Sequence, residues 1–247
     1  MSFIQTDRYD LRTYECDARG RLHVPALMHL MQESANRNAA DYGISMAHLA
    51  ELGLGWMLMR FRLTMHHAPR TGQSIRVITY PTAVEKYFIY RDFQVRSADD
   101  TLLAEASSTW LVFDQTKRGL IPLPDVVRTV AIPPGIIPLP RLSAKPAFAA
   151  TPLLPDRETT VGVGWFSIDT NQHVNNVAYV QWLLEALGAH WLTHYALTEL
   201  DSVYRGETYL GAQLRVQSGG PPDALRHQLI DDTGRAVVLA QTRWKKS

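Results

Sequence analysis

The sequence predicts an α+β fold built from two similar halves, each a long helix wrapped by an antiparallel sheet. One observation is an internal repeat, in which Asp17 precedes Glu33 by sixteen positions and Asp169 precedes Glu185 by the same interval. A second is that strand-forming segments follow a helical run in each half. The third is a proline-dense stretch between the halves.

The elements follow in the same order in both halves, beginning with an entry strand. A helix is predicted over 24–40, and from Asn176 the run VAYVQWLLEALGAHWL is apolar around most of its circumference, as in a helix buried on nearly all sides. Segments rich in β-branched and aromatic residues and broken by Gly, Pro or Asp predict strands. These segments are 55–65, 74–81, 88–97 and 102–114, then 202–210, 213–218, 225–231 and 236–244.

The proline-dense stretch is residues 133–155, which can form neither a regular helix nor a central strand. We expect it to be a linker between a first domain, 1–132, and a second, 156–247.

Composition predicts a globular protein with a substantial core, since 46% of the 247 residues are hydrophobic. The charges balance at 25 basic and 24 acidic residues, which gives no support to nucleic-acid binding through bulk charge. A single cysteine, Cys16, excludes an internal disulfide. No secretory signal appears, and no apolar run approaches the ~18 residues of a membrane span, so we expect a soluble, cytoplasmic protein.

Asp169, Asn171 and His173 form the most informative cluster, just before the second helical run. On a locally extended segment their side chains would project to one side and could reach one substrate atom. Asn175 or Asn176 is expected to cap the helix. Free backbone N–H groups at such a helix start would stabilise an oxyanion.

Other chemistries lack their signatures. The chain has no G-x-S-x-G elbow of a serine hydrolase, no H-E-x-x-H motif and no paired cysteines. Asp169 and His173 alone would be an incomplete metal-ligand set. We therefore expect neither a metal nor a nucleotide cofactor.

Across most of its length the chain resembles the acyl-ACP thioesterases of plants and bacteria, which are two fused hotdog domains. The motifs that carry the resemblance are DTNQHVNNVAYVQWLLE (169–185), VYRGET (203–208), WMLMRFRL (56–63), PRTGQSIRV (69–77), and ASSTWLVFD with IPLPDVVR (106–128). The resemblance implies hydrolysis of an acyl thioester, releasing a fatty acid from acyl carrier protein (ACP) and ending fatty acid synthesis. It also adds Glu207 to the active-site set of Asp169, Asn171 and His173.

One active site per chain is expected, because the first copy has Arg19 and Arg21 where the second has Asn171 and His173. The acyl chain is expected in the first half, against deformable side chains of its helix and first long strand. These substrate-binding candidates are Trp56, Met57, Met59, Met28 and Met31.

The mechanism expected is direct attack by water, with Asp169 or Glu207 as general base. The residue after Glu207 is Thr208, where relatives often carry cysteine, so a cysteine nucleophile is untenable here. On a strand, Glu207 would point toward the helix start, while Arg205 could pair with a nearby carboxylate.

Several arginines could form a basic patch for the acidic ACP. They are Arg60, Arg62, Arg91 and Arg96. A hotdog acyl-CoA thioesterase, a non-catalytic acyl-carrier binding protein and, less favoured, a hotdog dehydratase remain alternatives. The acyl length and oligomeric state stay open, a homodimer being one option.

Overall fold

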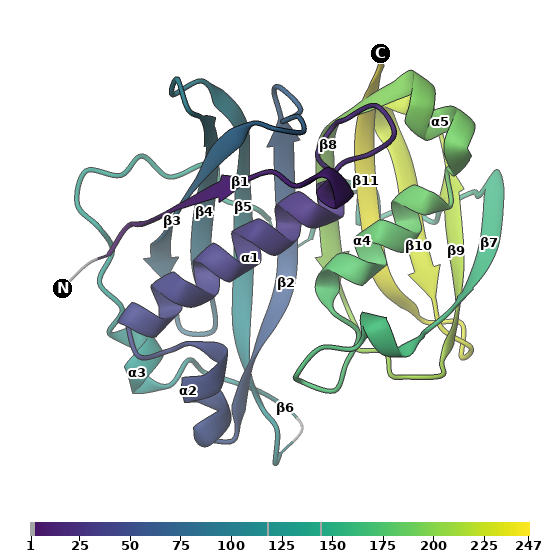
Figure 1. Cartoon of the computed structure of the whole chain (residues 1–247). Coiled ribbons are helices and arrows are strands. Elements are labelled where there is room, and N and C mark those ends of the chain that lie inside the picture. The colour runs from purple at the N-terminus through teal and green to yellow at the C-terminus, as the bar shows by residue number, and fades with distance from the viewer. Residues whose placement is uncertain (1–2, 118, 144) are drawn as a thin grey trace. The chain divides into compact units, whose positions relative to one another are not determined.

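The structure is a computed structural model that describes residues 3–117, 119–143 and 145–247 (Figure 1). The chain divides into two compact units, Met1–Leu142 and Ser143–Ser247. Each unit sets a helix against an antiparallel sheet, so the predicted α+β class is confirmed.

The sheet of the first unit follows the order β1-β3-β4-β5-β2, with the short β6 attached to β5, and every pairing is antiparallel. Its strands are β1 (Gln5–Asp10), β2 (Leu54–Met65), β3 (Ser74–Val84), β4 (Ile89–Ser97), β5 (Leu102–Asp114) and β6 (Gly119–Ile121). The strands predicted at 55–65, 74–81, 88–97 and 102–114 are all present, with small differences at their ends.

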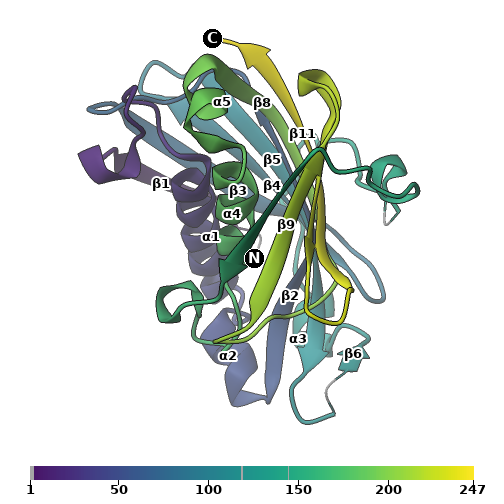
Figure 2. The same cartoon turned by 90° about the vertical axis from the view of Figure 1, so that its right-hand side faces the viewer.

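Helix α1 (Val24–Asp41) lies across one face of this sheet (Figures 1 and 2). A proline in its first turn suits a position where a backbone N–H has no helical partner. Its buried residues recur at helical spacing and form one stripe. They are Leu27, Met28, Met31, Ser34, Ala35, Asn38 and Ala39.

Two short helices, α2 (Met46–Glu51) and α3 (Asp125–Arg128), belong to an apolar cluster of the first unit. The indole N–H of Trp56 donates to the Ile44 carbonyl at 2.8 Å, which holds the chain between α1 and α2 against β2. The cluster also contains Leu49, Leu54, Ile89, Val112, Leu123 and Val127.

The second unit repeats the same strand order. Read from β7, it is β7-β9-β10-β11-β8, which matches β1-β3-β4-β5-β2. Its strands are β7 (Arg157–Gly162), β8 (Tyr195–Tyr204), β9 (Gln213–Gly219), β10 (Leu225–Ile230) and β11 (Ala236–Lys246). The two units therefore share one topology, as the internal repeat predicts.

The second helical run is interrupted, which differs from the single helix that its apolar pattern suggests. It forms α4 (Asn176–Glu185) and α5 (Gly188–His194). Gly188 has a φ of +80°, a left-handed conformation that breaks the helix and that glycine adopts without steric cost.

The strand predicted at 202–210 was wrong beyond residue 204, because β8 ends at Tyr204. The Arg205 N–H still donates to the Val237 carbonyl at 2.8 Å, after which the chain leaves the sheet. The Thr208 carbonyl instead accepts from the Val174 N–H at 2.9 Å, so the following loop is bonded to the segment before α4.

Within 133–155, the described residues form no α-helix or strand, and Ala147–Ala149 makes one 3₁₀ turn. Part of this stretch is fastened to the first unit, where the Leu139 N–H donates to the Asp92 carboxylate at 2.7 Å. No helix in the described parts of the chain is long and apolar enough to cross a membrane.

Candidate active site

The polar cluster of the second unit is built on a tight turn that precedes α4. Ile168 and Val174 form an antiparallel bridge, and the Asp169 N–H donates to the His173 carbonyl at 2.9 Å. Gln172 has a φ of +65°, which a residue with a side chain rarely adopts. Asp169, Asn171 and His173 therefore lie on a closed turn, and the extended segment that we predicted for them was wrong.

The turn feeds directly into α4 through Asn175. Its side chain accepts from the Val177 N–H at 2.9 Å, and its backbone has the extended conformation of an N-cap. The expectation that Asn175 or Asn176 caps this helix is thus confirmed for Asn175. The cap places the positive end of the α4 dipole beside the turn.

Asp169 carries a raised pKa, mainly because the folded protein buries its carboxyl group. Hydrogen bonds from the Asn171 backbone, the charge of His173 and the side chains of Asn175 and Asn171 oppose that rise without cancelling it. The Asn171 N–H donates to the carboxylate at 2.8 Å. Asp169 is therefore held in place while its affinity for a proton is increased, which suits a general base.

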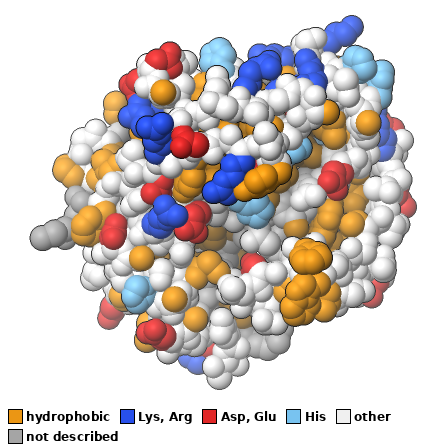
Figure 3. Space-filling view, viewed as in Figure 1, with side chains coloured by type: hydrophobic (Ala, Val, Ile, Leu, Met, Phe, Trp, Pro, Cys, Tyr) orange, Lys and Arg blue, Asp and Glu red, His pale blue; other side chains and the backbone are white. Residues whose placement is uncertain are grey.

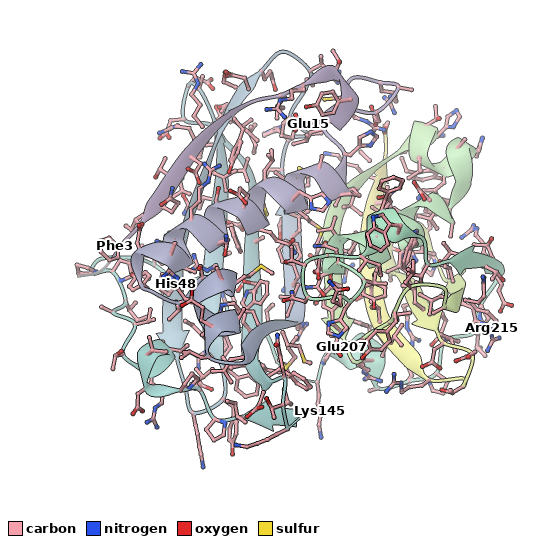
Figure 4. All side chains as sticks on the ribbon, turned by 60° about the horizontal axis from the view of Figure 1, so that its bottom comes forward. Phe3, Glu15, His48, Lys145, Glu207 and Arg215 are labelled. Atoms are coloured by element: carbon pink, nitrogen blue, oxygen red, sulfur yellow. The ribbon has the colours of Figure 1, made fainter. Side chains whose placement is uncertain are left out.

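His173 and Glu207 form a second polar pair. The His173 Nε2 and Glu207 Oε2 atoms lie 3.3 Å apart, and each side chain is 29% exposed. Tyr209 supports both, since its hydroxyl donates to Glu207 at 3.3 Å and its ring meets the imidazole edge-on at 5.0 Å. Figure 4 labels Glu207 on the loop that follows β8.

The loop position of Glu207 corrects the predicted strand geometry. Glu207 reaches His173 because the Thr208 carbonyl is bonded to Val174, immediately after the turn. Arg205 is exposed and forms no ion pair with any described residue, so the predicted carboxylate partner of Arg205 was wrong. Tyr209 was not among the predicted site residues, although it lies only two positions after Glu207.

The first unit contains the same turn without the same chemistry. The Asp17 N–H donates to the Arg21 carbonyl at 2.7 Å, and Gly20 stands at positive φ where the second copy has Gln172. The Asp17 carboxylate is paired with the Arg21 guanidinium at 2.8 Å. Burial would raise the pKa of Asp17, but hydrogen bonds from Arg21 and Arg19 outweigh it and lower the pKa.

The proposed arginine patch was wrong. Arg60 and Arg91 are buried, at 5% and 7% exposure, so neither can belong to a surface patch. The Arg91 guanidinium donates to Asn38 at 2.9 Å and to Thr79 at 3.1 Å, between α1 and the sheet. Arg96 is engaged with Gln94 and the Asp100 carbonyl.

The candidate acyl-chain residues lie in the first unit, in two environments. Met28 and Met31 are buried on the sheet-facing side of α1. Trp56, Met57 and Met59 are half-buried on β2. Their contact with an acyl chain remains a proposal.

No group of three or more His, Cys, Asp or Glu side chains that could hold a metal ion occurs among residues 3–117, 119–143 and 145–247. The described residues of the site offer two carboxylates, an imidazole, amides and a helix N-terminus.

An exposed aromatic pair stands immediately before the turn. Trp165 and Phe166, in the 3₁₀ helix Trp165–Ser167, are 71% and 102% exposed. Figure 3 shows a hydrophobic group over this short helix. In the first unit the corresponding 3₁₀ helix carries Tyr14, which is 72% exposed.

Comparison with known proteins covers both units. Residues 3–130 match the acyl-ACP thioesterase N-terminal domain, and residues 154–246 match the acyl-ACP thioesterase C-terminal domain. The chain is 27% identical over 262 residues to a chloroplastic palmitoyl-acyl carrier protein thioesterase of Cuphea hookeriana, covering 96% of this chain and 61% of that protein. The chain thus spans less than two thirds of the length of this relative.

Solved structures show the same fold. A 12:0-ACP thioesterase from Umbellularia californica has a TM-score of 0.82 at 22% identity, covering 99% of this chain and 98% of the other. An acyl-ACP thioesterase from Bacteroides thetaiotaomicron has a TM-score of 0.82 at 21% identity, covering 98% of both chains. The predicted double hotdog is confirmed, and with both domain matches the chain belongs to the acyl-ACP thioesterase family.

Proposed function

We propose that this protein hydrolyses acyl-ACP thioesters to a free fatty acid and holo-ACP by direct attack of water. The observation that supports this most is the site of the second unit, where Asp169 and the His173–Glu207 pair converge at the start of α4. The family provides the substrate class, and the site provides the groups that hydrolysis of a thioester needs.

Asp169 is the general base in this proposal. It removes a proton from water as the oxygen attacks the thioester carbon, and its raised pKa makes it a stronger base than an ordinary aspartate. Asn171 orients the water or the thioester. The carbonyl oxygen becomes an oxyanion, which a backbone N–H near Asn175 and Asn176 and the α4 dipole stabilise.

His173 is the general acid. The Glu207 Oε2 atom lies 3.3 Å from the His173 Nε2 atom and orients the imidazole. When the tetrahedral intermediate breaks its carbon–sulfur bond, His173 gives its proton to the departing thiolate of the carrier. Asp169 then releases the proton taken from water, His173 regains one through solvent, and both groups return to their starting states.

The direct test is a hydrolysis screen with acyl-ACPs of graded length and the matching acyl-CoAs. We expect release of fatty acid and holo-ACP, with greater kcat/KM on ACP than on CoA. Faster turnover of acyl-CoA would favour the acyl-CoA thioesterase alternative. Acyl-ACP binding without hydrolysis would identify a non-catalytic carrier-binding protein and refute the proposal.

A further inference from the structure

Two buried hydroxyl groups beside the candidate site have no hydrogen-bond partner among the described residues. They belong to Tyr179 in α4, which is 2% exposed, and Thr208 in the loop after β8, which is 4% exposed. Leaving a buried hydroxyl unpaired lowers the stability of the folded state. The two hydroxyls therefore do not stabilise the fold, and a functional role would explain their presence.

The two hydroxyls are neighbours, and they lie next to both carboxylates of the site. Burial raises the pKa of Tyr179 to about 12, and the Thr208 side chain and backbone are the groups that oppose this rise. Glu207 and Asp169 both raise it further through their charges. The phenol thus stays protonated at working pH and can donate toward Thr208, although the contact falls short of hydrogen-bond geometry.

The first unit supplies an internal comparison. The Leu22 N–H donates to the Pro69 carbonyl at 2.8 Å, as Val174 does to Thr208, so Pro69 corresponds to Thr208 and Ala68 to Glu207. In the shared frame of the turn and helix, Leu27 corresponds to Tyr179.

Leu27 is completely buried, so an aliphatic side chain satisfies the packing of this helix position in the first copy. The phenol of Tyr179 occurs in the copy that also has a glutamate and a threonine on the facing loop. In the copy where these are alanine and proline, the hydroxyl is absent as well.

We infer that Tyr179 is a positioning residue whose hydroxyl, acting through Thr208, holds Glu207 at the distance from His173 that catalysis needs. This inference rests on the proposed function. Thr208 is a suitable intermediary, because its carbonyl is already bonded to Val174 and its neighbour is the carboxylate itself. A small movement of the loop would complete the Tyr179–Thr208 hydrogen bond and set the His173–Glu207 distance.

Tyr204 provides a matched control. It is a second buried phenol, with its ring 6.3 Å from that of Tyr179. Its hydroxyl has a partner of its own, donating to the Asn176 carbonyl at 3.3 Å. Tyr204→Phe therefore removes a buried phenolic hydroxyl but keeps the hydroxyl of Tyr179, which faces Thr208.

The kinetic test compares Tyr179→Phe, Thr208→Val, their double variant and Tyr204→Phe on one acyl-ACP. Tyr179→Phe keeps the ring, so we expect kcat to fall on the order of 10- to 100-fold with KM changed less than about twofold, as for a misplaced catalytic group. The double variant should be no slower than the slower single variant, because both hydroxyls act along one route. Tyr204→Phe should stay within about threefold of the wild-type kcat.

A second measurement does not depend on turnover and so separates this inference from the proposed function. The ¹⁵N chemical shifts of the His173 ring report its contact with Glu207. Tyr179→Phe should change them in the same direction as Glu207→Gln, and Tyr204→Phe should leave them unchanged. Unaltered His173 signals in a folded Tyr179→Phe protein would overturn the inference. So would a near-normal kcat of Tyr179→Phe on an acyl-ACP that the wild type hydrolyses.

Discussion

The buried His227 makes the stability of the second unit dependent on pH, and the structure allows the size of this effect to be worked out. His227 is 2% exposed, with Nδ1 2.8 Å from the Ser218 hydroxyl and Nε2 2.7 Å from the Thr242 hydroxyl. Burial, with a smaller contribution from the charge of Arg157, lowers the pKa of His227 to about 3. The imidazole is therefore neutral in the folded protein over most of the acidic range.

The unfolded chain binds this proton near the ordinary histidine value of 6.5, whereas the folded chain does not until about 3. The stability is therefore fully present above pH 6.5 and is lost progressively as the pH falls toward 3. One proton of difference corresponds to a slope of about 1.4 kcal/mol per pH unit. At pH 4.5 the folded state should have lost about 2.7 kcal/mol through this one residue.

The assay is urea unfolding of the wild type and of His227→Gln between pH 4 and 7.5, followed by circular dichroism. Glutamine can bond both hydroxyls but does not titrate, so other groups cancel in the comparison. Below pH 6.5, the free energy of unfolding of the wild type should fall more steeply with decreasing pH than that of His227→Gln, by about 1.4 kcal/mol per pH unit. Parallel pH dependences would show that His227 is protonated in the folded state and would refute this reasoning.

Four further predictions concern activity. Asp169→Asn should reduce kcat by at least about 10²-fold. Asp17→Asn should keep the rate nearly intact, because its turn lacks the counterparts of Asn171 and His173. A comparable loss in a folded Asp17→Asn protein would contradict the single site. Glu207→Gln should lower the rate by about 10² to 10⁴, measured as kcat on acyl-ACP, and near-normal turnover would remove Glu207 from the mechanism. Since burial raises the pKa of Asp169, the acid limb of kcat/KM should lie above the ordinary aspartate value of 3.8, activity being lost as the pH falls through it; a limb at or below 3.8 would exclude Asp169 as the base. Cys16→Ala should remain active and be unaffected by thiol alkylation, and an inactive but folded variant would restore a thiol mechanism.

Much of the fold could be predicted from the sequence because its two halves repeat the same order of elements. The repeated frame of the two halves and the strand segments rich in β-branched and aromatic residues are signals that can be found in the sequence alone. The helix break at Gly188 depends on a single left-handed residue within an apolar run, which the hydrophobic pattern does not reveal.

The sequence groups the candidate site residues, but it does not give their geometry. Asp169, Asn171 and His173 are close in sequence, so one tight turn is enough to bring their side chains together. The approach of Glu207 depends on the bond between Thr208 and Val174, which joins segments that are far apart in the chain. Likewise the burial of Arg91 depends on how α1 covers the sheet, because charge alone does not distinguish a buried arginine from an exposed one.

The central claim is that water attacks the thioester directly, with the carboxylates of the second unit acting on protons and charge. A single turnover of acyl-ACP in H₂¹⁸O, with mass spectrometry of the fatty acid and of the peptides containing Asp169 and Glu207, tests it most directly. Direct attack predicts one ¹⁸O atom in the fatty acid of the first turnover and no label or acyl group on either peptide. An unlabelled first fatty acid together with ¹⁸O in Asp169 or Glu207 would show an acyl-enzyme anhydride and would contradict the claim.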